Sequence, residues 1–408
     1  MSLELNLEEI SATRVLGSGA MGTVFLATTS GNPTRFALKV VEKNSDESNR
    51  RARWEVNVLS RLNHPFLPTL LGSLETEEFI AWAVPFCSGG DLNALRYSQI
   101  DRVFSFSAIR FYVSEIVVAI SHLHRLGIVY RDLKPENVLV QESGHVTLTD
   151  FDLSRHLSHS SPTTNICDLT DHVPKRNTQR RNITRILLSS LSTRSSSNSS
   201  STVEEDRKRQ LKKAKSARVL PVSRRRSINA GEMSNSFVGT VEYVSPEVVR
   251  GDGHDFAVDW WALGILTYEM AYGVTPFRGR NRRETFHKVL MQEPEYIGRQ
   301  SAELTSFISQ LLAKDPYRRL GSGDGAEEVK SHPFFHGVQW DLLASVTRPP
   351  YIADDVSDLV GDQKFDIRDH FAKQKSNKLK KETISCSSPS TGGGSPTPSP
   401  SSVLFAGF

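Results

Sequence analysis

The chain has 408 residues, of which 38% are hydrophobic and 24% charged, so it can bury a substantial core. This composition excludes collagen-like, coiled-coil and repeat-array proteins. No run of eighteen apolar residues occurs, and the acidic first residues lack the hydrophobic block of a signal peptide, which predicts an intracellular protein. Cys87, Cys167 and Cys386 lie far apart and predict neither a disulfide nor a zinc site.

A glycine-rich stretch at residues 17–24 lies between two short apolar segments, 13–16 and 24–27, that are typical of strands joined by a hairpin. The same glycine spacing occurs in dinucleotide-binding folds, but there a helix must begin at the third glycine. Thr23-Val24-Phe25 favours a strand instead. We therefore expect backbone amides of the hairpin to cover phosphate groups. The residues assigned to this role are Leu16, Gly17, Ser18, Gly19, Ala20, Met21, Gly22, Thr23 and Val24.

A lysine interrupts the apolar strand predicted at residues 36–41. Lys39 needs a partner there, because a buried charge is costly unless it is paired. In a phosphoryl-transfer site such a lysine contacts the α and β phosphates of ATP. Glu55, on a predicted helix sixteen residues later, is the best candidate to pair with Lys39. Glu47 is the alternative, and we expect it on a solvated helix face.

Residues 130–137 read Tyr-Arg-Asp-Leu-Lys-Pro-Glu-Asn, and residues 150–152 read Asp-Phe-Asp. The spacing fits the phosphoryl-transfer template, in which one Asp accepts the proton of the substrate hydroxyl and a downstream Asn and Asp hold magnesium ions. The template assigns Asp132 as the base, with Lys134 beside it, and Asn137 and Asp150 as the metal ligands.

With these motifs the chain resembles the eukaryotic Ser/Thr protein kinases over roughly residues 11–336. It is most similar to plant AGC kinases of the UNICORN-like and oxidative-signal-inducible branch, because Asp152 replaces the usual Gly, a long insertion follows, and the chain ends in Phe-Ala-Gly-Phe. The resemblance implies an α+β bilobal fold, ATP and Mg²⁺ as cofactors, and a monomer. The expected divisions are a small lobe at 11–90, the large lobe at 91–154 and 232–336, an insertion at 155–231 and a tail at 337–408.

The resemblance also assigns structural roles in the large lobe and at the hinge. Glu247 is expected to pair with Arg319, and Asp259 to brace the catalytic loop. Lys134 together with Thr240 is the pattern of Ser/Thr specificity. At the hinge, Val84 becomes the gatekeeper, and the Pro85 carbonyl and Cys87 amide face adenine, since proline loses only a donor.

Substrate choice and activation are implied by the same resemblance. Asp91, Glu136 and Glu269 match positions where kinases of this group recognise basic residues before the target Ser or Thr. Ser236 is the expected activating phosphosite, with Arg131 pairing its phosphate. The upstream phosphoinositide-dependent kinase is expected to phosphorylate Ser236 after Phe405 and Phe408 dock.

The insertion is strongly basic, with seventeen Lys or Arg against five Asp or Glu between residues 155 and 231. It is rich in Ser and Asn and has no Phe, Trp or Tyr, which predicts disorder. Its basic blocks suit a nuclear importer or an anionic lipid surface. A solvated tether is the alternative, and the lack of aromatics argues against nucleic acid as the main partner. We expect a cytoplasmic and nuclear location, with the plasma membrane periphery as the alternative.

A pseudokinase that acts as a docking scaffold is the second functional hypothesis. Asp152 is the sequence feature that favours it, because the family Gly allows the segment to flip. We expect Asp152 to restrict the backbone and hold Asp150 inward, which would alter conformational switching more than chemistry.

Overall fold

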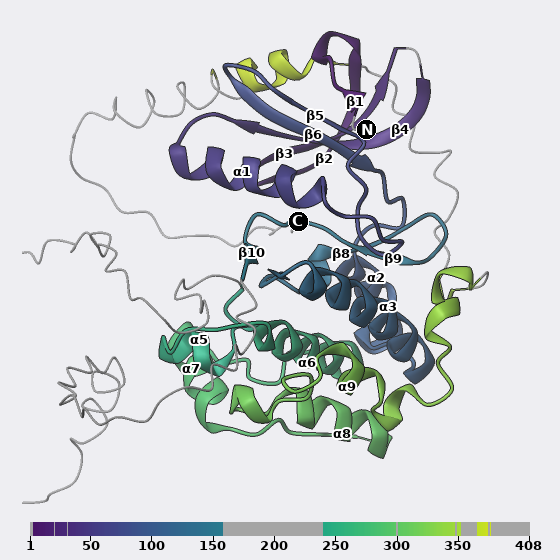
Figure 1. Cartoon of the computed structure of the whole chain (residues 1–408), viewed down its shortest axis with the longest axis vertical. Coiled ribbons are helices and arrows are strands. Elements are labelled where there is room, and N and C mark those ends of the chain that lie inside the picture. Colours follow the sequence, from purple (N-terminus) through teal and green to yellow (C-terminus); the bar gives the residue numbers. More distant parts are fainter. Residues whose placement is uncertain are drawn as a thin grey trace, which may run out of the picture.

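The computed structural model describes residues 3–19, 21–30, 32–157, 240–298, 301–346, 349–351, 365–373 and 376. The sequence-based predictions for most of the insertion, for Ser236 and for Phe405 and Phe408 concern residues outside these ranges. The described chain forms two lobes, one built on a sheet and one helical (Figure 1).

The small lobe contains a six-stranded sheet with the strand order β1-β5-β6-β4-β3-β2. β1 runs parallel to β5, and the other neighbouring strands are antiparallel. A short 3-10 helix, η1 (Leu7–Glu9), links the first two strands. The strands are β1 (Leu3–Glu4), β2 (Ile10–Gly19), β3 (Gly22–Thr29), β4 (Asn32–Glu42), β5 (Gly72–Glu75) and β6 (Phe79–Pro85).

Helix α1 (Asp46–Leu59) covers one face of this sheet (Figure 1). It begins at Ser45, whose side chain accepts a hydrogen bond from the Ser48 amide at 3.2 Å, the usual way to satisfy a free N–H at a helix start. Acidic residues in its first turn suit the positive end of the helix dipole. Its buried residues recur at helical spacing and include one charged side chain, Glu55.

The opposite face of the sheet is covered by a returning part of the tail. The Phe365 amide donates to the Ala12 carbonyl at 2.9 Å, and residues 367–373 form a helical segment beside the small lobe (Figure 1). Ile367 and Phe371 are 4% exposed and belong to the same hydrophobic cluster as Phe25. The tail thus completes the core of the small lobe, a contact that the sequence does not predict.

The large lobe is mainly helical. Two short strand pairs join it: β7 (Ile128–Val129) with β10 (Arg155–His156), and β8 (Val138–Val140) with β9 (Val146–Leu148). Its α-helices are α2 (Leu92–Ser98), α3 (Phe106–Arg125), α5 (Pro246–Arg250), α6 (Ala257–Tyr272), α7 (Arg282–Met291), α8 (Ala302–Leu311) and α9 (Ala326–Lys330). Its 3-10 turns are η2 (Ile100–Arg102), η3 (Pro135–Asn137), η4 (Pro316–Arg318), η5 (Pro333–Phe335) and η6 (Trp340–Ser345).

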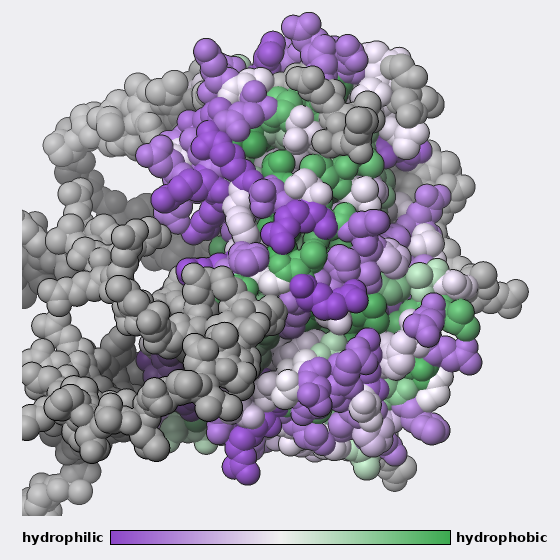
Figure 2. Space-filling model, in the orientation of Figure 1, coloured by the Kyte–Doolittle hydropathy of each residue, from purple (hydrophilic) through white to green (hydrophobic). Residues whose placement is uncertain are grey.

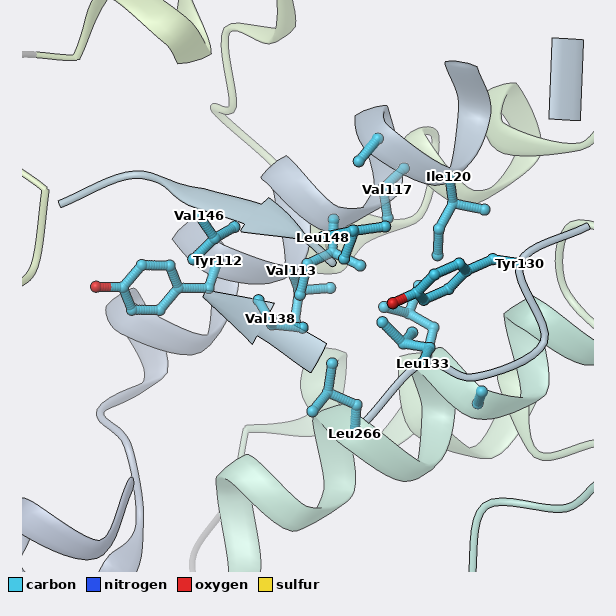
Figure 3. Close-up of a cluster of buried hydrophobic side chains, with 14 of the residues drawn as sticks. Tyr112, Val113, Val117, Ile120, Tyr130, Leu133, Val138, Val146, Leu148 and Leu266 are labelled. Atoms are coloured by element: carbon cyan, nitrogen blue, oxygen red, sulfur yellow. The ribbon is translucent and has the colours of Figure 1, made fainter. Parts of the chain in front are cut away.

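Helix α3 is the central helix of this lobe. By length and hydropathy it would pass as a membrane span, but most of it is buried inside the protein, as expected for a core helix. Figure 3 shows Val113, Val117 and Ile120 of α3 meeting Tyr130 and Leu133 of the following loop in one hydrophobic cluster. Because Tyr130 and Leu133 are at most 1% exposed, the polar residues between and after them are fixed to the core.

The face drawn in Figure 2 is mainly hydrophilic, and its hydrophobic side chains form small separate areas. Large exposed hydrophobic residues such as Ile100 and Ile297 are scattered, as is normal for a protein surface. The predicted α+β bilobal fold is confirmed.

Candidate active site

A cavity of about 490 Å³ lies where the two lobes meet. Side chains from the hairpin, the hinge and the catalytic segments line it together. The residues among them that the sequence predicts for this site are Leu16, Gly17, Val24, Lys39, Glu55, Val84, Pro85, Cys87 and Asp150.

The glycine hairpin connects β2 and β3. Ser18 and Thr23 face each other, with their hydroxyl oxygens 3.1 Å apart, and Gly19 pairs with Gly22. Gly22 has φ +112°, and a Cβ there would lie 2.3 Å from the Val40 carbonyl oxygen, so only glycine fits. Met21 is half-buried at the turn, whereas Ala20 lies outside the described residues.

Lys39, on β4, is held by two carboxylates. Its Nζ lies 2.9 Å from Glu55 Oε2 and 2.7 Å from Asp150 Oδ1. Burial acts to lower the pKa of Lys39, but the two carboxylates outweigh it and raise the pKa, so the ammonium stays charged. Burial, together with Asp150, raises the pKa of Glu55 to about 7 against the opposing effect of Lys39. The predicted Lys39–Glu55 pair is therefore present, and the Glu47 carboxylate instead pairs with Arg51 on an exposed part of α1.

Asp132 lies at the end of a tightly bonded loop. Its Oδ2 accepts hydrogen bonds from Lys134 Nζ and Asn137 Nδ2, each at 2.8 Å. Burial raises the pKa of Asp132, while the bonds from Lys134 and Asn137 oppose this shift. The arrangement leaves a carboxylate beside a lysine, at a position where a substrate hydroxyl can be received.

Asn137 and Asp150 provide oxygen atoms suited to a magnesium ion. Because Asn137 Nδ2 is committed to Asp132, its side-chain carbonyl oxygen is the atom left to bind a cation. Asp150 has φ +59° and a side chain that is 35% exposed on the cavity. Mg²⁺ typically takes one or two such protein oxygens and completes its octahedron with water and phosphate, so the donors fit it. No group of three or more His, Cys, Asp or Glu in the described part of the chain is arranged to hold a metal ion, and such a magnesium site needs none.

The structural pairs predicted for the large lobe are also present. Arg319 binds Glu247 through two hydrogen bonds of 2.7 and 2.9 Å, with both residues buried. Asp259 accepts from the backbone amides of Tyr130 and Arg131 at 2.8 and 2.7 Å.

A comparison with protein families then gives a direct match. The protein kinase domain model matches residues 10–184 and 223–335. The chain belongs to the protein kinase family. The kinase is 55% identical over 381 residues to serine/threonine-protein kinase UCNL of Arabidopsis thaliana, covering 90% of this chain and 89% of the relative.

Two further relatives from the same plant place the kinase within the family. It is 53% identical over 391 residues to serine/threonine-protein kinase UCN, covering 92% of each chain. It is 42% identical over 364 residues to serine/threonine-protein kinase OXI1, covering 86% of this chain and 80% of the relative. The kinase is thus a serine/threonine-protein kinase of the plant AGC type, near the UNICORN and OXI1 branch, as predicted.

The hinge of the kinase is the end of β6. Pro85 pairs with Phe36 of β4, and it lines the cavity together with Val84 and Cys87. Burial raises the pKa of the Cys87 thiol to about 12, so the thiol stays protonated.

The three acidic side chains predicted to recognise basic residues of the substrate differ in their surroundings. Asp91 caps α2, accepting from the Ala94 amide at 2.7 Å, and it lines the cavity with Glu136. Glu269 pairs with Arg96 at 3.1 Å and accepts a hydrogen bond from the Tyr243 hydroxyl at 2.5 Å. Burial raises the pKa of Glu269, and the nearby Glu136 adds to this, while Tyr243 and Arg96 oppose it.

Sequence reasoning missed a set of contacts around Asp152. This residue is 8% exposed, and its Oδ2 lies 3.6 Å from Arg51 Nη1 of α1. Nearby, Trp54 Nε1 of α1 donates to Ser154 Oγ at 3.0 Å. Arg51, one helical turn before Glu55, indicates that α1 places a charged side chain on the same side as Glu55. Nothing in the sequence shows which carboxylate Arg51 pairs with.

Proposed function

We propose that this serine/threonine kinase transfers the γ-phosphoryl group of ATP, with Mg²⁺, to proteins that carry basic residues before the target Ser or Thr. The observation that carries the proposal is the Lys39–Glu55–Asp150 cluster, which lines the cavity between the lobes, together with the hydrogen-bonded Asp132–Asn137 pair. Phosphoryl transfer needs charge stabilisation and positioning more than covalent participation by the protein, and these groups can supply both.

Each residue of the site has one role in this proposal. Lys39, fixed by Glu55, binds phosphate oxygens, and the hairpin amides cover them. Asp150 and the amide oxygen of Asn137 would hold magnesium, which when bound neutralises charge on the phosphates. Asp132 orients the substrate hydroxyl and accepts its proton, while Lys134 stabilises the negative charge beside it.

Adenine is proposed to bind at the hinge. A proline lacks only the amide hydrogen, so the Pro85 carbonyl remains an acceptor for the adenine amino group, and the Cys87 amide is the donor. Leu16 and Val24 then pack on the base from the hairpin side.

Recognition of basic substrates is proposed for the region formed by Asp91, Glu136 and Glu269. Glu136 is exposed, which allows it to meet a substrate guanidinium directly. Glu269 already neutralises Arg96, so we assign it the smaller part of this recognition.

Activation is proposed to follow phosphorylation of Ser236 by an upstream phosphoinositide-dependent kinase. Arg131 Nε donates to the Leu153 carbonyl at 2.7 Å, next to Asp152, whose carboxylate lies 3.6 Å from Arg51. Burial lowers the pKa of Arg131 to about 10, and the nearby charges of Arg155 and Arg51 add to the shift, while Asp259 and Asp152 oppose it. A phosphate offers three acceptor oxygens and about two negative charges, and it would relieve this repulsion.

The tail residues Phe405 and Phe408 are proposed to dock in a groove of a small lobe. In this chain a cavity of about 720 Å³ beside α1 has an apolar part formed by Val56, Leu74 and Ile80. The groove of the upstream kinase is the other proposed acceptor, so that docking recruits it. Partners of the basic insertion are proposed to be an importer or an anionic lipid, with a role in growth, developmental or stress signalling and a cytoplasmic and nuclear location.

The test is magnesium-dependent transfer of labelled phosphate from ATP to a peptide with Arg two and three residues before Ser. Wild type should label it, Asp132→Asn should not, and a peptide with both Arg replaced by Ala should be labelled less. Labelling by wild type that stays at the background level of Asp132→Asn would support the scaffold hypothesis instead, which the assembled site does not favour.

A further inference from the structure

The residue after Asp150-Phe151 is a buried carboxylate that faces helix α1. The Asp152 side chain is 5% exposed, and its Oδ2 lies 3.6 Å from Arg51 Nη1. The other terminal nitrogen of Arg51 lies 2.6 Å from Glu47, which is 66% exposed. Arg51 therefore joins the solvent-facing start of α1 to the buried segment that carries Asp150.

A second contact joins the same two elements. Trp54 Nε1 donates to Ser154 Oγ at 3.0 Å, and Ser154 Oγ donates to the Phe151 carbonyl at 2.6 Å. Positions 51, 54 and 55 lie on one side of α1, because residues three and four apart are neighbours on a helix. All three positions contact residues 150–154 or the lysine bound to them.

The backbone of Asp152 does not account for its presence. The described non-glycine residue with positive φ in this segment is Asp150, at +59°, and not Asp152. The backbone of residue 152 in this structure is therefore one that any residue adopts, and the expected restriction of other conformations by Asp152 stays a prediction. What the aspartate adds is its side chain.

The ion-pair partner of Asp152 differs from that of Asp150. The Asp150 carboxylate lies 2.7 Å from Lys39, whereas the Asp152 carboxylate is 5% exposed and lies 3.6 Å from Arg51 of α1. The Asp152 carboxylate is therefore placed to position α1 rather than to contact ATP.

We infer that Asp152 is a positioning residue whose carboxylate holds α1 through Arg51, and so keeps Glu55 on Lys39 before the activation segment is phosphorylated. This rests on the proposed function, since Arg51 also belongs to the cluster proposed to receive the phosphate. Asp152 then acts as a built-in anion at the edge of that cluster. Once a phosphate is present, α1 has a second anchor and depends less on Asp152.

The test compares five full-length proteins after phosphatase treatment: wild type, Asp152→Asn, Arg51→Gln, the double variant, and Arg50→Gln. Arg50 is the matched control, because it is the adjacent arginine of α1, is exposed, and takes no part in the ion pairs of Arg51 with Glu47 and Asp152. We expect kcat for a basic peptide to fall about 3- to 10-fold in each single variant at Asp152 or Arg51, the size expected for a pair with one buried partner. The double variant should fall no further, because both changes remove one interaction.

After phosphorylation by the upstream kinase, the kcat of Asp152→Asn should lie closer to the kcat of wild type. A structural role alone would lower activity equally in both phosphorylation states. Unchanged kcat in Asp152→Asn, additive losses in the double variant, or a loss as large as that of Asp150→Ala would each overturn the inference. Thermal melting of every variant shows whether it is folded.

Hydrogen exchange of the α1 amides, residues 46–59, separates this inference from the proposed function. Faster exchange in Asp152→Asn and Arg51→Gln, with Arg50→Gln like wild type, supports the anchor even if no protein transfers phosphate. Inactive wild type and Arg50→Gln would show that the proposed function fails. Unchanged exchange in Asp152→Asn and Arg51→Gln would show that the anchor fails.

Discussion

Asp259 accepts a hydrogen bond of 2.7 Å from the backbone amide of Arg131, a residue held at φ +68°. A non-glycine residue in that conformation costs free energy, so the surrounding contacts must hold it. Asp259 is fully buried and also accepts from the Tyr130 amide at 2.8 Å. The position of Asp132, the next residue, therefore depends on a carboxylate from a helix more than a hundred residues away.

Replacing Asp259 by Ala should lower both stability and turnover. Two buried amides would lose their acceptor, at about 1–3 kcal/mol each, and the Arg131 conformation would relax. We expect a lower urea midpoint and a kcat reduced at least tenfold. The exposed Asp252→Asn should change neither. If a folded Asp259→Ala protein has the kcat of wild type, the loop that carries Arg131 and Asp132 keeps its conformation without Asp259.

Lys39→Ala and Asp150→Ala should each abolish transfer in a folded protein. Charge stabilisation of this kind is expressed mainly in the transition state, so kcat should fall by about 10²-fold or more. Steady-state labelling of a basic peptide measures this, with circular dichroism to check the fold. Labelling at the wild-type rate by either variant would contradict the assignment of the site.

Gly22→Ala should damage the phosphate-covering hairpin. The new Cβ would lie 2.3 Å from the Val40 carbonyl oxygen, at a φ that alanine rarely adopts. We expect a lower melting temperature and a higher KM for ATP. Gly17→Ala is the stability control, because its Cβ meets nothing within 4 Å. Equal melting of the two variants would show that the hairpin can move away from β4.

Much of this site could be predicted because short motifs encode it. The order and spacing of Lys39, Asp132, Asn137 and Asp150 depend on the chemistry of phosphate and metal, and those residues are recognisable without coordinates. The Glu55 partner followed from the cost of leaving a lysine unpaired in an apolar strand. The fold class followed from the same motifs.

The contacts that could not be predicted are those that depend on packing between distant segments. Nothing near Arg51 or Asp152 in the sequence specifies that they meet. Phe365 and Phe371 read as parts of a polar tail, and only the sheet face they cover explains their hydrophobicity.

Acid should weaken the fold through two histidines, the buried His254 and the partly buried His64. Burial lowers the pKa of His64 and of His254 from 6.5 to about 4. A lowered pKa means that the unfolded chain binds protons more readily, so stability is complete above pH 6.5 and falls as the pH drops towards 4. In this range, each histidine lowers the free energy of unfolding by at most about 1.4 kcal/mol for each unit by which the pH falls. Urea unfolding of wild type and His64→Asn between pH 7 and pH 4.5 measures this. The variant should show the shallower dependence, and equal slopes would mean that His64 is not the responsible group.

The last prediction concerns the tail on the outer face of the small lobe. Phe371 is 4% exposed, and its ring centroid lies 5.2 Å from that of Phe79 and 6.0 Å from that of Phe25. Removing a buried aromatic ring costs about 3–5 kcal/mol, so Phe371→Ala should lower the free energy of unfolding substantially. Because β3 and β4 carry Gly22 and Lys39 on this sheet, the KM for ATP should rise as well. Asp369→Asn, exposed on the same helical segment, is the matched control and should melt like wild type. If Phe371→Ala melts like the control, the segment contributes nothing to the small-lobe core, and its apolar residues need another explanation.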